Sequence, residues 1–377
     1  MVALLWKMAQ AKRTGWSFTP LDFLLVAVPV ALALRFVPAW RNDTLLFIVA
    51  AVAIVPLAGW MGRATEQLAA RSGAGIGGFL NATFGNAAEL IIALVALSKG
   101  LIGVVKASIT GSIIGNLLLV LGASILIGGM RTRRQTFNQT AARISVTSLG
   151  LAAIGLLIPT IFHRASAARP GGWSEEIEQR LSLAIVLVLL LTYFFSLFFH
   201  LVTHRDLFAG PPEKETSEGH WPLWQSITAL AGATILVALL SEFLVGSIEA
   251  ARHSLSLTET FVGVVIVAFV GNAAEHSTAV WAAWKNKMDL SLNIATGSSL
   301  QMALFVTPVL VLSSYFFDHP MTLEFSLPEI ASIVFSIWIV GQISSDGESN
   351  WLEGLQLLAV YSVIALLFYF LPPLVPQ

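Results

Sequence analysis

Hydrophobic positions in this chain form long runs, each about as long as a membrane is thick, and short polar stretches separate them. A helix that spans a bilayer needs about 20 mostly apolar residues, and on that rule we expect about eleven such helices. The expected spans are 20–37, 44–61, 76–98, 102–128, 143–162, 181–203, 224–244, 259–284, 289–314, 326–344 and 351–371. The pattern predicts an all-α, polytopic membrane protein.

The most polar interval lies near the middle of the chain and is rich in acids. Its charged residues flank Pro211-Pro212 and are Asp206, Glu213, Glu215 and Glu218. We interpret residues 204–223 as an acidic cytoplasmic linker between two halves. The expected parts are a first segment with one helix at 1–43, a first half with helices two to six at 44–203, the linker, and a second half with helices seven to eleven at 224–377.

Composition supports the membrane interpretation and excludes several function classes. The 377 residues are 56% hydrophobic and only 11% charged, whereas soluble domains carry about 25% charged residues. The mean hydropathy is +0.79, so membrane lipid is the expected environment.

A net charge of −1 without a basic tract argues against nucleic acid as a partner. Without cysteine there are no disulfides, thiolate metal sites or cysteine nucleophiles. No phosphate-binding loop is present, so we expect neither direct use of ATP nor an organic cofactor.

Basic residues indicate the orientation of the chain. Cytoplasmic loops carry an excess of Lys and Arg, and a short loop holds Arg131, Arg133 and Arg134. The expected spans place this loop on the same side of the membrane as the N-terminus. We therefore expect both to be cytoplasmic. No signal peptide is apparent, and the compact loops suit a bacterial inner membrane. The sequence is compatible with a homo-oligomer.

A sequence repeat links the two halves. Gly85-Asn86-Ala87-Ala88-Glu89 reappears as Gly271-Asn272-Ala273-Ala274-Glu275, and the same shift of 186 residues maps Thr110-Gly111-Ser112 onto Thr296-Gly297-Ser298. The two copies fall in the third and eighth expected spans, so the second copy enters the membrane from the opposite side. This predicts a 5+5 inverted-topology repeat, an arrangement found in many secondary transporters, with the site at the repeat interface.

The repeat places one acid, Glu89 or Glu275, in each of two apolar helices. A charged side chain at bilayer depth costs about 2.5–3.5 kcal/mol on insertion scales. A chain that accepts this cost twice in the same local sequence uses the two acids together. The alternative is that each glutamate is a structural partner for a backbone group or a lysine. The identical five-residue sequences around the two glutamates argue against this alternative.

Other oxygen-bearing side chains surround the two acids in the sequence. Those on the same helices as the acids or on the helices that follow are Asn86, Asn272, Ser112, Asn116, Ser298, Ser299 and Gln301. Carboxylate, amide and hydroxyl oxygens suit a hard cation such as Ca²⁺, which takes six to eight oxygen ligands. Interhelical hydrogen bonding is the alternative for each serine and amide.

Gly85 and Gly271 offer backbone freedom, and a broken turn there would free carbonyl oxygens. His276 is a candidate to relay protons or tune Glu275, or it hydrogen-bonds within the bundle.

Two segments resemble the signatures of a known family. Residues 81–90 with Gly111-Ser112-Ile113-Ile114-Gly115-Asn116, and residues 270–276 with Gly297-Ser298-Ser299-Leu300-Gln301, are similar to those of the Ca²⁺/H⁺ exchangers in the Ca²⁺/cation antiporter superfamily. The resemblance implies ten core helices in two inverted halves, an extra N-terminal helix and an acidic stretch between the halves. It also implies that Glu89 and Glu275 bind Ca²⁺ and H⁺ in turn.

The expected function is therefore a secondary active antiporter, not an enzyme. Two carboxylates close together in a low dielectric cannot both stay ionised cheaply, so they would take up protons as a pair. Either one divalent cation or two protons would neutralise them at the membrane midplane, which couples Ca²⁺ flux to opposite H⁺ flux. The alternatives are an antiporter of the same fold for Mn²⁺/H⁺ or Na⁺/Ca²⁺, or a membrane-embedded acid–base enzyme. A scaffold without transport leaves the paired acids unexplained.

Overall fold

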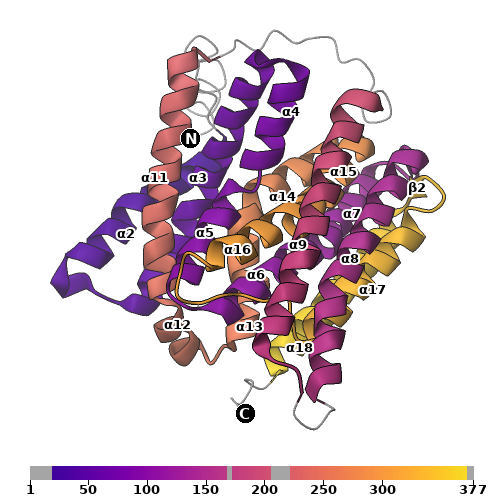
Figure 1. The fold of residues 1–377 in the computed structure, drawn as a ribbon. Coiled ribbons are helices and arrows are strands. Elements are labelled where there is room, and N and C mark those ends of the chain that lie inside the picture. Colours follow the sequence, from indigo (N-terminus) through magenta and orange to yellow (C-terminus); the bar gives the residue numbers. More distant parts are fainter. Residues whose placement is uncertain (1–18, 168–171, 205–220, 372–377) are drawn as a thin grey trace, which may run out of the picture.

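The structure, a computed structural model, describes residues 19–167, 172–204 and 221–371 (Figure 1). Most of the predicted linker, 205–220, lies outside the described residues. The elements before it are η1 (Pro20–Val26), α2 (Ala27–Phe36), η2 (Pro38–Trp40), α3 (Asp43–Arg71), α4 (Gly73–Phe84), α5 (Ala87–Ser98), α6 (Ile102–Ile114), η3 (Gly115–Val120), α7 (Leu121–Arg131), β1 (Gln135–Thr136), α8 (Gln139–Ala167), α9 (Glu175–Phe198) and η4 (Phe199–Thr203).

The second half has a similar series of elements. They are α11 (Leu223–Gly246), α12 (Ile248–Leu255), α13 (Glu259–Phe261), η5 (Val262–Val267), α14 (Ala268–Trp284), α15 (Met288–Gln301), η6 (Met302–Val306), α16 (Thr307–Ser314), α17 (Leu327–Ile343), β2 (Glu348–Ser349) and α18 (Trp351–Phe370). Eight of the described helices are long and apolar enough to span a membrane, and two shorter apolar ones cover Ala87–Ser98 and Leu327–Ile343. The prediction of a helical, polytopic membrane protein is confirmed.

Local signals in the sequence explain where several helices begin. Asn42 accepts a hydrogen bond from the Leu45 amide (2.9 Å) and so caps α3. Ser326 and Glu329 form a reciprocal capping box at the start of α17, and Asn350 forms one with its partner Glu353 at the start of α18. These side chains satisfy amide groups that would otherwise lack partners at the helix ends.

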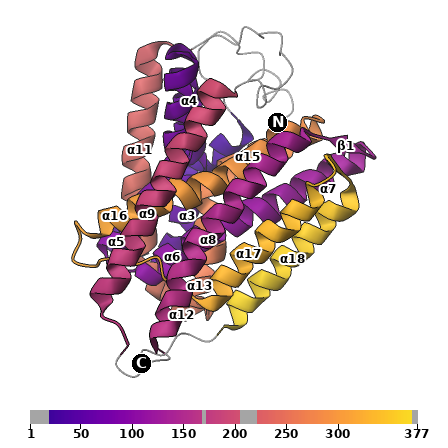
Figure 2. The ribbon, with the colours of Figure 1, turned by 45° about the vertical axis from the view of Figure 1, so that its right-hand side comes forward.

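Burial separates central helices from peripheral ones. The apolar windows of Ile102–Arg131 and Met288–Ser314 are each 72% buried by the rest of the protein, against 22% for Glu175–Thr203 and Trp351–Phe370. The helices α6, α7, α15 and α16 therefore form the middle of the bundle, and α9 and α18 lie on its periphery. Figure 2 shows α17 and α18 along one side of the molecule and α11 along the other. The exposed apolar side chains of the peripheral helices suit lipid.

The repeat seen in the sequence recurs in the secondary structure. Shifted by 186 residues, α6 and η3 fall on α15 and η6, so each half carries a π-helical turn at the same place. Such turns are rare and frequently occur at functional sites. Both follow the Gly-Ser pair that the sequence analysis singled out.

The halves differ at the repeated motif itself. The expected third span is interrupted, because α4 ends at Phe84 and α5 begins at Ala87. The break that Gly85 favours therefore exists. The same expectation is wrong for Gly271, which lies inside the continuous helix α14. In that half the irregular turn comes earlier, as η5.

Two small features were not predicted. The strands β1 and β2 pair antiparallel, with Gln135 opposite Ser349, and they join the α7–α8 loop to the α17–α18 loop. The eight-residue helix α12 lies between the expected seventh and eighth spans. Both features lie between the long helices and leave the predicted spans unchanged.

Candidate functional site

The two repeated glutamates lie in different helical contexts. Glu89 is in the first turn of α5, just after the break, and only 6% of it is exposed. Glu275 is in the middle of α14 and is partly buried. Neither carboxylate oxygen of Glu89 has a hydrogen-bond partner among the described residues, and the same holds for Oε2 of Glu275. Buried polar groups normally have partners, so these oxygens make the acid pair the candidate site.

Each glutamate packs against the glycine of the other copy. A Cβ placed on Gly271 would lie 2.6 Å from Cγ of Glu89, and one placed on Gly85 would lie 3.5 Å from Oε1 of Glu275. The contact is reciprocal, and it brings the two carboxylates close enough to interact electrostatically. The repeated motif is thus one site assembled from both halves. Sequence reasoning assigned the glycines backbone freedom and missed the space that they leave for the opposite acid.

A buried network of amides and hydroxyls connects the two halves beside the acids. Asn272 Nδ2 donates to Ser112 Oγ (3.0 Å), and Ser298 Oγ donates to Asn86 Oδ1 (3.0 Å). These two pairs are equivalent under the repeat, and each pair joins one half to the other. Asn116 Nδ2 donates to Ser298 Oγ (2.9 Å) and reaches Asn272 Oδ1 at 3.4 Å. The network fixes the orientation of both repeated asparagines.

Ser298 and Gln301 tie this network to the acids. Ser298 lies within hydrogen-bonding reach of the Glu275 carboxylate and 3.3 Å from Asn272 Oδ1. Its single hydroxyl hydrogen serves one acceptor at a time. Gln301 Oε1 accepts from Asn86 Nδ2 (2.6 Å), at the break between α4 and α5. Every one of the eight residues predicted to bind the cation belongs to this cluster or to the acid pair.

Other candidates lie outside the network. The Ser299 hydroxyl donates to Ala295 O (2.9 Å) on its own helix and lies 3.3 Å from Ile113 O, which fits interhelical bonding rather than a ligand role. His276 packs its ring on Phe269, with centroids 5.4 Å apart. Its Nδ1 atom is buried and has no hydrogen-bond partner within the described part of the chain. His276 directly follows Glu275 in the sequence, but its side chain is not part of the amide and hydroxyl network.

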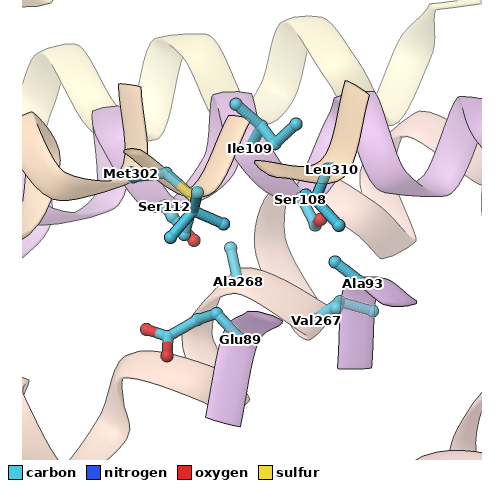
Figure 3. A pocket seen from close by; sticks show the side chains of 10 residues that line it. Glu89, Ala93, Ser108, Ile109, Ser112, Val267, Ala268, Met302 and Leu310 are labelled. Carbon is cyan, nitrogen blue, oxygen red and sulfur yellow. The ribbon is translucent and has the colours of Figure 1, made fainter. Parts of the chain in front are cut away.

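A small cavity starts at Glu89. Its lining includes Ser108 and Ser112 of α6, Met302 of η6 and Leu310 of α16. Figure 3 shows Glu89 on one side of the cavity and Ser112 with Met302 on the other. About 10 Å³ is open to the centre of a water molecule, which is room for about one water. Most of the lining is apolar, and its polar residues are Glu89, Ser108 and Ser112.

The ligand chemistry of the cluster is all oxygen. Across residues 19–167, 172–204 and 221–371, no three His, Cys, Asp or Glu side chains gather as a metal-binding group. The site instead combines two carboxylates with amide and hydroxyl oxygens. Such a donor set fits a hard cation that is bound and then released, because conduction and transport require binding that is not too tight.

Comparison with known proteins places this helical membrane protein in a family. The family model described as sodium/calcium exchanger protein matches residues 42–202 and 225–370, and the chain belongs to this family. A Ca²⁺/H⁺ antiporter of Synechocystis sp. is 46% identical over 368 residues, which cover 93% of this chain and 97% of the relative. One of Bacillus subtilis is 45% identical over 353 residues, with 93% and 99% covered.

A solved structure extends the comparison to the fold. The structure of native YfkE superimposes with a TM-score of 0.80 at 41% identity, covering 93% of this chain and 100% of the other. The resemblance to the Ca²⁺/cation antiporter superfamily seen in the sequence is confirmed. The protein is a multi-pass membrane protein of a transporter family that has bacterial members.

Proposed function

We propose that this protein exchanges Ca²⁺ for H⁺ across a membrane, using Glu89 and Glu275 as the shared binding site. One observation carries the proposal: each glutamate packs against the glycine of the opposite repeat and keeps carboxylate oxygens without partners. Relatives that are named Ca²⁺/H⁺ antiporters and cover nearly the whole chain support the choice of ions.

The coupling follows from charge. Two carboxylates at one buried point repel each other, so the empty dianion is costly in a low dielectric. One Ca²⁺ neutralises both charges, and so do two protons, but the two loads exclude each other. Only the neutral, loaded site changes its exposure from one side of the membrane to the other, and this links Ca²⁺ flux to H⁺ flux in the opposite direction.

The surrounding side chains have separate tasks in this proposal. The Oδ1 atoms of Asn86 and Asn272 add oxygen ligands for Ca²⁺. Ser112, Asn116, Ser298 and Gln301 complete the oxygen set and hold the two asparagines in position. His276 carries protons between Glu275 and the aqueous phase.

The site lies at the membrane midplane, where the two inverted halves meet. Helices that move against the site expose it to each side in turn. The N-terminus is cytoplasmic and the membrane is a bacterial inner membrane, with residues 204–223 as a cytoplasmic linker. This assignment follows from the clustered arginines after α7.

The test is transport by the purified protein in proteoliposomes with an imposed pH gradient. We expect uptake of radiolabelled Ca²⁺ that collapses with the pH gradient. Mn²⁺, Mg²⁺ and Na⁺ are added in turn as competitors. Uptake driven by a Na⁺ gradient but not by a pH gradient would contradict the proposal and favour Na⁺/Ca²⁺ exchange, and stronger transport of Mn²⁺ than of Ca²⁺ would favour the manganese alternative.

A further inference from the structure

A largely buried ion pair links the N-terminal segment to α3 and has no part in the acid cluster. Arg63 Nη2 of α3 donates to Asp22 Oδ1 of η1 at 2.8 Å, and the two side chains are 21% and 4% exposed. Taking two charges out of water is costly, and well-packed hydrophobic side chains of similar volume often hold two elements together equally well. The two charges therefore call for a task beyond packing.

Asp22 is the partner that fixes the Arg63 guanidinium. The other polar contact of the guanidinium is a long one of 3.4 Å to Thr19 Oγ1, and the group lies over the Trp60 ring, 4.9 Å from its centroid. Its Nε atom is buried and has no hydrogen-bond partner among the described residues. Asp22 is itself held, because Trp60 Nε1 donates to it at 2.7 Å. Without the charge of Asp22, little would keep the guanidinium in place.

Arg63 faces the helix that carries one of the paired acids. Ala274 Cβ and Arg63 Nη1 both lie within 4 Å of the point where a Cβ of Gly59 would stand, at 3.7 and 3.8 Å. The guanidinium therefore lies beside the turn of α14 that holds Glu275, the residue after Ala274. Gly62 belongs to the same face of α3, and a Cβ there would meet nothing within 4 Å. The two glycines leave the guanidinium room to move.

A guanidinium without its carboxylate would act at this place as a built-in cation. In a low dielectric, charges interact over several ångströms with little screening, and Arg binds carboxylates with two parallel hydrogen bonds. Oε2 of Glu275 has no hydrogen-bond partner within the described residues and is free to accept such a group. A guanidinium on Glu275 would occupy this carboxylate and repel Ca²⁺.

Glu66 is the other acid near Arg63, and it does not replace Asp22. It follows Arg63 by three residues on the same face of α3 and interacts with it electrostatically. Because Glu66 is exposed, water weakens this attraction. Asp22 is buried and belongs to η1, which packs against α3. It therefore holds the guanidinium at the N-terminal segment.

We propose that Asp22 is a positioning residue for the exchange: it holds Arg63 at η1 and so keeps this built-in cation off Glu275. The proposal rests on the proposed exchange function and gives the N-terminal segment a role in the affinity for Ca²⁺. With Asp22 in place the pair is neutral, and its field falls off faster with distance than that of a single charge. Once Asp22 loses its charge, Arg63 competes with Ca²⁺.

Ca²⁺ binding to the purified full-length protein tests the proposal without transport. Calorimetric titration with Ca²⁺ compares the wild type with Asp22→Asn, Arg63→Gln and the double variant, after thermal unfolding has shown that each is folded. We expect the dissociation constant to rise at least tenfold in Asp22→Asn. In Arg63→Gln and in the double variant it should rise by less than about threefold, because the competing charge is gone.

The double variant separates competition from a purely structural role. If Asp22 only fastened the N-terminal segment, the double variant would bind Ca²⁺ as weakly as Asp22→Asn, and that result would overturn the proposal. Unchanged binding by Asp22→Asn would overturn it as well. Glu176→Gln is the matched control, because it removes the acid of an exposed pair with Arg180 and should leave the dissociation constant within about twofold.

The charge itself can be restored chemically, since the chain has no cysteine of its own. In Asp22→Asn with Arg63→Cys, the thiol is converted to a mixed disulfide that carries either an aminoethyl or a methyl group, and mass spectrometry checks completion. The positive aminoethyl group should raise the dissociation constant for Ca²⁺ at least fivefold, and the neutral methyl group should change it less than twofold. Equal constants for the two adducts would contradict a role of the charge.

Transport then distinguishes competition from slower turnover. For uptake of radiolabelled Ca²⁺ driven by a pH gradient, Asp22→Asn should raise KM at least tenfold and keep at least half of the maximal rate. A lower maximal rate with an unchanged KM would overturn the proposal. Absence of both Ca²⁺ binding and uptake in the unmodified protein would contradict the proposed function itself, whereas wild-type behaviour of Asp22→Asn would contradict only the role of Asp22.

Discussion

Glu89 fills the space that Gly271 leaves by having no side chain, with its Cγ atom 2.6 Å from where a Cβ would stand. Real Cβ atoms do not approach this closely, so the glycine is required by the acid of the other half. At Gly85 a Cβ would lie 3.5 Å from Oε1 of Glu275, an ordinary contact distance, and 2.8 Å from the Asn81 carbonyl oxygen. The close packing of acid against glycine is therefore specific to Glu89 and Gly271.

The first prediction concerns Gly271→Ala. The added methyl group displaces Glu89, and Ca²⁺ uptake should fall at least tenfold while the protein still folds. Gly232→Ala is the control, because Gly232 lies within a helix and a Cβ there meets nothing within 4 Å. Uptake and thermal unfolding in detergent are measured for both. Normal uptake by Gly271→Ala would show that the close packing is not needed.

The second prediction concerns the hydroxyl of Ser298. Removing it takes away the acceptor at 2.9 Å from Asn116 Nδ2 and the donor to Asn86 Oδ1, and each buried hydrogen bond lost in this way costs about 1–3 kcal/mol. Ser298→Ala should therefore weaken the apparent affinity for Ca²⁺ by about tenfold or more. Ser291→Ala, on the same helix, is the control, since Ser291 is fully buried and its hydroxyl has no partner among the described residues. Equal affinities in the two variants would exclude Ser298 from the site.

The third prediction is that protons and Ca²⁺ compete. Because both acids must lose their protons to bind the cation, the dissociation constant for Ca²⁺ should rise as pH falls, by up to about a hundredfold per pH unit when two protons are displaced. Titration calorimetry in buffers of different ionisation enthalpy counts the protons released. An affinity that does not change with pH would contradict the shared site.

The fourth prediction concerns the N-terminal helix. Asp22 Oδ1 accepts from Arg63 Nη2 (2.8 Å) and Trp60 Nε1 (2.7 Å), and its side chain is 4% exposed. Asp22→Ala leaves a largely buried guanidinium without its carboxylate, a loss of about 3 kcal/mol. Thermal unfolding should show a clear decrease in stability. Glu176→Ala breaks the exposed pair with Arg180 and should cost less than about 1 kcal/mol. Similar decreases for both variants would contradict the anchoring role of Asp22.

Much of the fold could be predicted from the sequence, because in a membrane the apolar runs and the helices coincide. The expected span 351–371 corresponds to α18 and the expected span 259–284 to α13, η5 and α14, to within a few residues. The repeated acids also indicated the candidate site, since a buried carboxylate is costly wherever it occurs.

The remaining features depend on tertiary packing, which the pattern of apolar residues along the chain does not reveal. Gly85 and Gly271 are followed by the same four residues, yet only Gly85 lies at a helix break. The buried connection 321–326 between α16 and α17 has no sequence signal of its own, since its partners Thr160 and Ser182 lie more than a hundred residues away in the sequence (165 and 141). Only the folded structure brings these hydroxyls to its amides.

The central claim is that Glu89 and Glu275 carry the exchange together. Glu89→Gln and Glu275→Gln keep nearly the same size and remove one negative charge, and each is reconstituted separately beside the wild-type protein. The measurement is uptake of radiolabelled Ca²⁺ driven by a pH gradient, with incorporation of the protein checked in every preparation. We predict that both variants lose this uptake. Full uptake by either variant would contradict the account.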